Sequence, residues 1–487
     1  MSLSDTTLAP ANPASSRRAS IGISIVLVAQ LMLVLDVTVV NVALPRIQTD
    51  LGFSSASLSW VLNAYTLAFG GLLLLGGRIG DVVGRRRVFR LGLTVFTLSS
   101  FAGALATDPT LLVVARTLQG AGAALAAPGV LALLTTSAPG EAARNRALAL
   151  FTAVSSTGAS VGLILGGVLT DVGSWRWTLL INVPIGLVVL ATVGRFVDET
   201  PRRPGRFDVV GAVTVTGAAV SAVYALITAP DHGWGSSTTI GLLALAVVLV
   251  VAFLVTEGRV AHPLLRLGLL QSRSRLAVLT IMALMVGAQF SMFFLAILYV
   301  QRVLGFGPLE SGLAFLPLSL AIFVASRLSP QLIKRVGPWP MIAVGTAGMA
   351  VTFLWISGLD TTSSYATAMF LPMLLNGLFA GFSFMPVTVI ALSNVEPEHA
   401  GAASGLLQTM QQLGGAIGLA VIVSVYTSHA VPGQVVPGLR EGFSTSAILD
   451  TIGILLAVSG VVAGVRAARA ARATQVLESE PVGSATA

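Results

Sequence analysis

The sequence contains no cysteine, which excludes disulfide bridges and thiolate metal sites. Its four histidines, His232, His262, His399 and His429, are scattered and show no metal-ligand spacing. Charged residues are also scarce, at 10% of 487 residues, where soluble domains carry about 25%. A chain so poor in charge, with a mean hydropathy of +0.89, is not a water-soluble globular protein.

What the chain has instead is a series of long apolar runs, and 55% of its residues are hydrophobic. Each run of about 18 to 25 residues is long enough to cross a hydrocarbon core about 30 Å thick. Because backbone in lipid must satisfy its own hydrogen bonds, each run is predicted to be a helix. The predicted helices lie near residues 21–44, 57–77, 88–107, 110–135, 146–170, 177–197, 208–228, 238–256, 276–301, 309–329, 340–358, 364–392, 401–428 and 446–465. The expected fold class is an all-α integral membrane protein with about fourteen transmembrane helices.

Basic residues are distributed unequally between the two sides of this topology. With a cytoplasmic N-terminus, 23 of the 28 Lys and Arg residues lie inside, and only Arg46, Arg176, Arg302 and Arg440 lie outside. The positive-inside rule then predicts that both termini are cytoplasmic. The net charge of +8 is therefore an orientation signal, and no nucleic-acid partner is expected. Arg17-Arg18 resembles a twin-arginine signal, but a positive-inside flank explains it fully.

The predicted helices divide into five consecutive parts. These are a cytoplasmic tail (1–20), an N-terminal six-helix bundle (21–200), two additional transmembrane helices (201–260), a C-terminal six-helix bundle (261–466) and a second cytoplasmic tail (467–487). Segments 77–87 and 325–337 occupy the same place in each bundle, and both combine basic residues with glycine. This weak internal repeat is typical of carriers.

We place two charged residues deep inside predicted helices, at similar depths. Asp36 lies about 12 Å and Arg116 about 9 Å from the outer ends of their helices, at 1.5 Å per residue. A charged side chain at such a depth costs about 2.5 kcal/mol or more, so a functional role is the default hypothesis. The alternatives are a carboxylate that only holds helices together, or a static Asp36–Arg116 ion pair. Since Asp36 is the one carboxylate that we place deep in the membrane, we expect one proton-binding site in the membrane-embedded helices.

The segment between the second and third helices combines glycine with Asp81 and four arginines, and a fifth arginine, Arg90, follows at the start of the third helix. Its glycines permit a tight turn, and Asp81 can accept hydrogen bonds from helix N-terminal amides or from arginines across an interface. The alternative to a functional role is an ordinary cytoplasmic loop, in which the arginines only set the orientation of the protein. The candidate residues of a cytoplasmic gate are Gly77, Asp81, Gly84, Arg85 and Arg86.

In the fifth helix, Gly158, Gly162 and Gly166 recur every four residues, with Gly167 beside them. A stripe of this kind lets a neighbouring helix approach closely. Taken alone, it indicates packing.

Together these segments resemble the major facilitator superfamily, and within it the branch of fourteen-helix drug:proton antiporters. LDVTVVNVALP (35–45) resembles that branch's first-helix motif, G-x-x-x-D-x-x-G-R-R-R (77–87) the superfamily's loop motif, and RTLQG (116–120) the fourth-helix motif whose arginine is assigned to proton handling. WRWTLLINVPIG (175–186) and FDVVG (207–211) resemble the joints around the two added helices. The sequence departs from the pattern at Val82, where a basic residue is preferred, and at Leu163, where the fifth-helix motif has proline.

The resemblance implies two six-helix bundles that face each other across a central substrate cavity and rock between two states. An amide side chain should avoid lipid, so polar residues in the helices are candidates for the cavity lining. The candidates are Asn41, Asn63, Tyr65, Gln119, Gln289, Phe293, Asn376, Gln408 and Gln412.

The implied function is a proton-coupled antiporter in the bacterial inner membrane that exports lipophilic drugs or antibiotics from the cytoplasm. Its expected partners are a small lipophilic substrate, protons and membrane lipids; it is expected to be a monomer, and to use no cofactor or metal. One alternative is a dedicated exporter of a single endogenous metabolite, and another is a membrane sensor that transports nothing. An enzyme is not expected, because the sequence offers no nucleophile–base or metal constellation.

Overall fold

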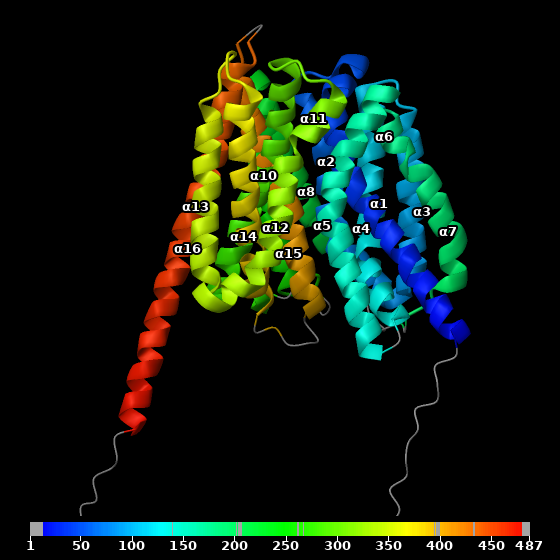
Figure 1. Ribbon diagram of the computed structural model, residues 1–487, viewed down its shortest axis with the longest axis vertical. Helices are drawn as coiled ribbons and strands as arrows, with labels where there is room; N and C mark the ends of the chain where they lie inside the picture. The colour runs from blue at the N-terminus through cyan, green and yellow to red at the C-terminus, as the bar shows by residue number, and fades with distance from the viewer. Residues whose placement is uncertain are drawn as a thin grey trace, which may run out of the picture.

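The computed structural model describes residues 13–138, 140–200, 202, 207–260, 263–265, 267–393, 395, 400–431 and 434–479. These residues form helices and no β-strand (Figure 1). The helices are α1 (Pro13–Leu51), α2 (Trp60–Val83), α3 (Arg85–Ala104), α4 (Pro109–Ser137), α5 (Gly140–Val172), α6 (Trp177–Leu180), α7 (Asn182–Phe196), α8 (Val209–His232), α9 (Ser237–Glu257), α10 (Arg273–Arg302), α11 (Pro308–Ala314), α12 (Leu316–Val336), α13 (Pro338–Ser357), α14 (Leu371–Leu392), α15 (Ala400–Ser428) and α16 (Val436–Ser479). Residues 1–12 and 480–487 of the predicted tails, with His262 and His399, lie outside the described residues.

Within the described residues, twelve helical segments are long and apolar enough to cross a membrane. The other two predicted spans are present as helices but are not among the twelve. One is α3, which begins with Arg85-Arg86-Arg87; the other is α5, whose apolar part is Val161–Val172. The expected count of fourteen spans therefore stays a prediction, while the helices themselves are all found.

The helices form two groups that stand side by side in Figure 1. In the first, α1 packs against α4, α5 and α7, and α4 packs against α2 and α3. In the second, α16 packs against α10 and α13, and α14 packs against α12 and α13. Helix α8 packs against both α2 and α15, so it bridges the two groups, while α9 packs on α8 and exposes Val247, Val248 and Val251.

Two helices extend well beyond their predicted limits. Helix α1 continues through Pro45 to Leu51. The prediction ended at this proline because proline lacks an N–H, but neighbouring helices in a membrane bundle can satisfy the freed backbone groups. Helix α16 begins at Val436 and not at 446, because Leu439 and Phe443 are buried around the polar Arg440 and Glu441 that interrupted the apolar run.

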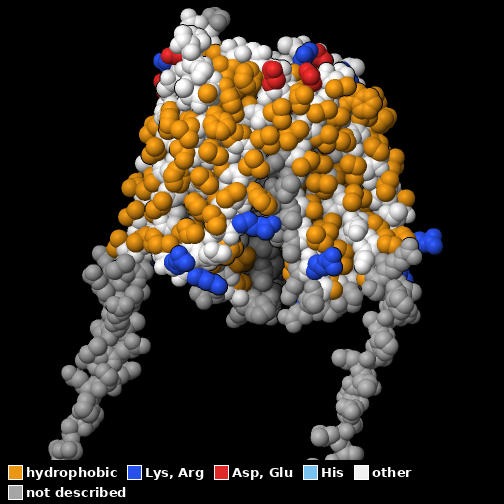
Figure 2. Space-filling view, viewed as in Figure 1, with side chains coloured by type: hydrophobic (Ala, Val, Ile, Leu, Met, Phe, Trp, Pro, Cys, Tyr) orange, Lys and Arg blue, Asp and Glu red, His pale blue; other side chains and the backbone are white. Residues whose placement is uncertain are grey.

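The two halves touch directly where α2 packs on α15, and again at the end opposite to the start of α1. There Gln301 Nε2 of α10 donates to the Val42 carbonyl of α1 at 3.1 Å, Arg302 donates to Gln48, and Gly167 of α5 lies against the backbone of Pro308 in α11. At the other end, Figure 2 shows a hollow between the halves and Lys and Arg side chains along the rim. The structure is therefore closed at one end and open at the end where α1 begins.

Candidate functional site

Asp36 and Arg116 form an ion pair inside the first helix group. Arg116 Nη1 of α4 donates to Asp36 Oδ2 of α1 at 2.7 Å, and each residue is 1% exposed. Helix α1 extends beyond its predicted end, so Asp36 lies near the middle of the Arg18–Leu51 span. Removing one partner of a buried pair typically costs about 3–5 kcal/mol, because it leaves an uncompensated charge.

Two amides complete the surroundings of the Asp36 carboxylate. Gln119 Nε2 and Asn182 Nδ2 donate to Asp36 Oδ1 at 2.6 and 2.7 Å, and Gln119 Nε2 also lies 2.7 Å from the Ser100 hydroxyl oxygen, which accepts from it. We predicted Gln119 as a cavity residue and did not single out Asn182. A buried amide in the apolar segment 175–186 was the signal that could have found it.

Arg116 is also held from two other directions. Its Nε donates to the Val61 carbonyl of α2 at 3.0 Å, and its Nη1 donates to Gln119 Oε1 at 2.7 Å. The Tyr65 ring lies 4.5 Å from the guanidinium carbon, in the geometry of a cation–π contact. The ion pair thus joins side chains and backbone from α1, α2, α3, α4 and α7, so a change in its charge acts on five helices at once.

The glycine stripe of α5 packs closely on α1, next to this cluster. A Cβ at Gly158 would lie 2.9 Å from Val34 Cγ1, and one at Gly162 or Gly166 would collide with Thr38 or Val39. Gly167 instead faces α11, where a Cβ would lie 2.7 Å from the Pro308 carbonyl oxygen. The stripe therefore sets the distance between α5 and the helix that carries Asp36.

The predicted gate residues gather where α2 ends and α3 begins. Arg85 Nη2 donates to Asp81 Oδ1 at 2.6 Å, and Arg85 Nη1 donates to the Pro128 carbonyl of α4 at 3.1 Å. Gly77 also faces Pro128, with 3.6 Å between its Cβ position and the proline Cβ. Among the described residues, the partners of Asp81 and Arg85 lie in the first helix group, so this cluster does not cross to the second in the present state.

Glu199, which we did not single out from the sequence, caps the N-terminus of α3. Its two carboxylate oxygens accept from the backbone N–H groups of Arg86 and Arg87 at 2.8 and 3.2 Å. The Arg86 side chain donates to the Val197 carbonyl at 2.9 Å. Gly84 has φ of 117°, and any Cβ there would lie 2.8 Å from the Glu199 carboxyl carbon. This glycine is required both by its backbone conformation and by the close carboxylate.

The predicted cavity residues of the first helix group are buried in it. Asn41 Nδ2 donates to the Val37 carbonyl one turn earlier at 2.9 Å, and Tyr65 and Gln119 belong to the Asp36 cluster. Asn63 is fully buried, and neither atom of its amide has a hydrogen-bond partner among the described residues. A buried amide without partners is costly, by about 1–3 kcal/mol. It is therefore a candidate contact for a polar group of a ligand.

In the second helix group the predicted cavity residues are spread over different environments. Gln289 is buried with both amide atoms unpartnered in the described structure, whereas Asn376 is fully buried and donates to Thr352 Oγ1 at 2.8 Å. Phe293 stacks on Phe315 with ring centroids 5.5 Å apart. On α15, Gln408 is exposed and Gln412 is half-buried against Gly70 of α2. Asn376 thus lies inside its own helix group, bonded to α13.

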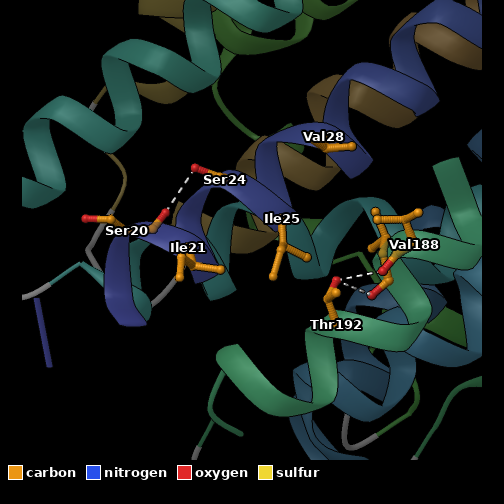
Figure 3. A pocket seen from close by; sticks show the side chains of 8 residues that line it. Ser20, Ile21, Ser24, Ile25, Val28, Val188 and Thr192 are labelled. Carbon is orange, nitrogen blue, oxygen red and sulfur yellow. Dashed lines mark hydrogen bonds between the residues drawn. The ribbon is translucent and has the colours of Figure 1, made fainter. Parts of the chain in front are cut away.

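A separate groove lies between the first part of α1 and α7 (Figure 3). Its volume is about 310 Å³, and it is lined by Ser20, Ile21, Ser24, Ile25, Val28, Val188, Val189 and Thr192. Its hydroxyl groups on Ser24 and Thr192 donate to carbonyls of their own helices, as the dashed lines in Figure 3 show. The groove therefore presents an apolar surface, and none of the predicted cavity residues lines it.

Two helix groups that meet at one end, a hollow at the other and a buried ion pair define the protein as a multi-pass membrane transporter. In the described part of the chain, no three His, Asp or Glu side chains are placed to hold a metal ion. Residues 26–419 match the family model of the Major Facilitator Superfamily, and the chain belongs to this family. It is therefore a transporter and not an enzyme.

Its relatives include proteins of antibiotic resistance and export. The chain is 41% identical over 452 residues to a puromycin resistance protein of Streptomyces alboniger, covering 89% of each chain. It is 42% identical over 402 residues to a cephamycin export protein of Amycolatopsis lactamdurans, covering 82% of this chain and 83% of the relative. A crystal structure of a POT family transporter in complex with a thioalcohol-conjugated peptide shares the fold, with a TM-score of 0.69, 15% identity, and coverage of 92% and 96%.

Proposed function

We propose that the protein exports lipophilic antibiotics from the cytoplasm in exchange for protons. The observation that carries the proposal is Asp36, a buried carboxylate that accepts from Arg116, Gln119 and Asn182 in the middle of a membrane span. An ionisable group at such a depth is a functional group by default. Similarity to puromycin resistance and cephamycin export proteins supports an antibiotic as the substrate.

The geometry around Asp36 suits its ionised form, because three donors point at its two oxygens. A proton on either oxygen removes the charge that holds Arg116 and turns one acceptor into a donor. Gln119 or Asn182 must then turn, and Arg116 keeps the Val61 carbonyl and the Tyr65 ring. Proton binding thereby loosens α1 from α4 and α7, and proton release restores the contacts.

We assign the open end of the molecule to the cytoplasm of a bacterial inner membrane, with both termini there and the protein acting as a monomer. The rim of Lys and Arg side chains at that end supports this orientation. The structure then represents an inward-facing state, in which Asp36 has released its proton and substrate enters the hollow. Asn63 and Gln289, with their unpartnered amides, are the side chains we assign to polar groups of the substrate.

The proton gradient is sufficient to drive such export. Moving one charge through 100 mV supplies about 2.3 kcal/mol, which corresponds to a nearly fiftyfold concentration ratio. In the cycle, protonation from outside favours one facing state, and proton release inward accompanies uptake of the antibiotic. Transport of this kind requires no cofactor.

Replacement of Asp36 by Asn tests the proposal. Inverted membrane vesicles are energised by respiration, and puromycin, cephamycin and lipophilic cations are added while the pH gradient is followed. In vesicles with wild-type protein, at least one compound should collapse the pH gradient. With Asp36→Asn this collapse should be lost completely, while the protein still folds. Asp231→Asn, which changes an exposed carboxyl in the last turn of α8, is the matched control and should behave as wild type. Full coupled activity of Asp36→Asn would refute the assignment.

A dedicated exporter of one compound is the second candidate, because each of these two relatives is named for a single antibiotic. The same panel separates the two functions. A response to several unrelated compounds supports multidrug export, and a response to one supports a dedicated exporter. A folded protein that responds to none and moves no substrate would favour the sensor interpretation.

A further inference from the structure

Asp450 is a second carboxyl group in the membrane-spanning part of the protein. It lies near the middle of the Val436–Val462 span of α16 and is 0% exposed. We did not count it among deep carboxylates, because the predicted helix began at 446 and placed it near the outer end. Helix α16 begins ten residues earlier than predicted, which places Asp450 deeper in the span. Asp36 is therefore not the one deep carboxylate of the chain.

The helix face that carries Asp450 points into the second helix group. One turn before it, Ser446 Oγ lies 2.9 Å from Ser291 Oγ of α10. One turn after it, a Cβ on Gly453 would lie 3.7 Å from Thr346 Cγ2 of α13. Residues three and four apart lie on the same helix face, so Asp450 lies between these contacts, on the side of α16 that faces α10 and α13.

Neither oxygen of Asp450 has a hydrogen-bond partner among the described residues. The nearby hydroxyl groups are used elsewhere: Ser446 donates to the Gly442 carbonyl, Ser291 to the Ala288 carbonyl and Thr346 to the Ile342 carbonyl. This contrasts with Asp36, whose two oxygens accept three hydrogen bonds.

No cation in the described structure compensates a charge on Asp450. Helix α13 has no titratable side chain, and apart from Asp450 those of α10, α15 and α16 up to residue 462 are Arg273, Arg275, Tyr299, Arg302, Tyr426, Arg440 and Glu441. Arg275 and Arg440 donate to backbone carbonyls, Arg302 donates to Gln48, and Arg273 and Glu441 are exposed. Tyr299 donates to the Asp360 and Ser363 carbonyls, and the Tyr426 ring lies against Gly438 of α16.

The two helix groups carry buried polar residues on corresponding helices. The Asp36 cluster uses the first, third, fourth and sixth long helices of its group, through Asp36, Ser100, Arg116 and Asn182. The second group has Ser291 on α10, Thr352 on α13, Asn376 on α14 and Ser446 and Asp450 on α16. These are again its first, third, fourth and sixth long helices, but no arginine accompanies this carboxyl group.

We infer that Asp450 is a second proton-binding site, which is loaded in this conformation and exchanges its proton during transport. An ionised carboxylate buried without a cation or a donor is strongly unfavourable, whereas a bound proton neutralises it. The step is a simple proton transfer: water on one side of the membrane gives a proton to the carboxylate, and the acid returns it on the other side. Together with Asp36, this site gives two protons per transport cycle, a count that rests on the proposed proton antiport.

The experiment uses the full-length protein in liposomes and has two independent readouts. Infrared difference spectra between wild type and Asp450→Asn report the C=O stretch of a protonated, non-hydrogen-bonded carboxylic acid. Puromycin flux under imposed pH gradients gives the number of protons per substrate from the gradient at which net flux reverses. Asp450→Ser is a second variant, because its hydroxyl can donate to the carbonyl one turn earlier, as Ser446 does. Asp231→Asn is the control.

The expected result is an acid band present in wild type and in Asp231→Asn and absent from both Asp450 variants. The proton count should fall from two to one in those variants. A tenfold proton gradient then supports about a tenfold puromycin gradient in place of about a hundredfold one.

Three results separate failure of this inference from failure of the proposed function. An unchanged infrared spectrum means that Asp450 holds no proton and overturns the inference. A lost band with an unchanged proton count means a permanently protonated structural acid, and also overturns it. If puromycin moves no protons in wild type, antiport of this compound fails, and the infrared spectra alone decide whether Asp450 binds a proton.

Discussion

Among the residues around Asp36, Asn182 makes one side-chain hydrogen bond in the described structure. Its Nδ2 donates to Asp36 Oδ1, while its own Oδ1 has no partner in the described structure. Gln119 by contrast bonds Asp36, Arg116 and Ser100 together. Asn182 is therefore a positioning residue for the carboxylate, and α7 reaches the ion pair through it alone.

Asn182→Ala should reduce proton-coupled export about tenfold. A hydrogen bond to a charged group contributes about 1.5–3 kcal/mol, and in the proposed cycle this donor holds the ionised form of Asp36. Binding of the drug without a gradient should stay as in wild type, because the lost contact acts on the proton site. Flux assays and equilibrium binding in proteoliposomes measure the two quantities.

The control for this variant is Thr192→Ala on the same helix. The Thr192 hydroxyl donates only to the Val188 and Val189 carbonyls of α7, so its removal should change neither coupling nor binding. Equal losses of coupling in both variants would mean that α7 as a whole is disturbed, and the positioning role of Asn182 would be wrong.

At the scale of elements, α1 and α5 show why the spacing of small residues matters in this protein. Three glycines of α5 face α1 at intervals of four, and the helix they touch carries Asp36. Lipid supplies little driving force for helix association, so close backbone packing has to hold these helices together. Helix α5 is continuous at Leu163, where the antiporter motif has proline, and the Leu163 side chain is buried.

Gly166→Ala should lower the thermal stability of the protein, although alanine normally favours a helix by about 1 kcal/mol. The new Cβ would lie 2.9 Å from Val39 Cα and still closer to the Val39 carbonyl oxygen, so α1 and α5 have to move apart. Gly241→Ala in α9 has nothing within 4 Å of the new Cβ and should be neutral or stabilising. Melting temperatures of both variants in detergent give the comparison; equal melting temperatures would contradict close packing at Gly166.

At the scale of the whole molecule, the two hydrogen bonds described above between α1 and α10 lie at the closed end. Gln301 bonds the Val42 carbonyl and Arg302 bonds Gln48, whereas the hollow lies at the other end (Figure 2). Helix α8 adds a packing contact with both α2 and α15. Alternating access therefore requires the α1–α10 contacts to break while α8 accommodates the rocking of the two halves.

The absence of native cysteine allows a direct test of this motion. The double variant Gln48→Cys, Arg302→Cys should cross-link with a short bifunctional thiol reagent, since the native side chains are in contact. Cross-linking should lower the rate of drug export more than tenfold. Drug access from the open end of the molecule should stay intact. Each single cysteine variant, treated in the same way, should keep its activity. Undiminished export by the cross-linked protein would mean that this end does not open.

The sequence by itself determined the membrane-embedded helices, because apolar runs and their breaks are local properties of the chain. It also singled out Asp36, Arg116 and the glycine stripe, since a charge or a repeated glycine in an apolar helix is conspicuous without any knowledge of its neighbours. Orientation and the number of spans remain predictions from the same local signals.

Only the tertiary structure decided which polar residues meet. Asn182 reaches Asp36 from 146 positions away, and Asn376 of α14 bonds Thr352 of α13. The true limits of α1 and α16 also depended on contacts, because neighbouring helices make it favourable to continue past Pro45 and to include Arg440. Depth and partners of a buried charge are properties of the packed bundle, so Asp450 became visible only there.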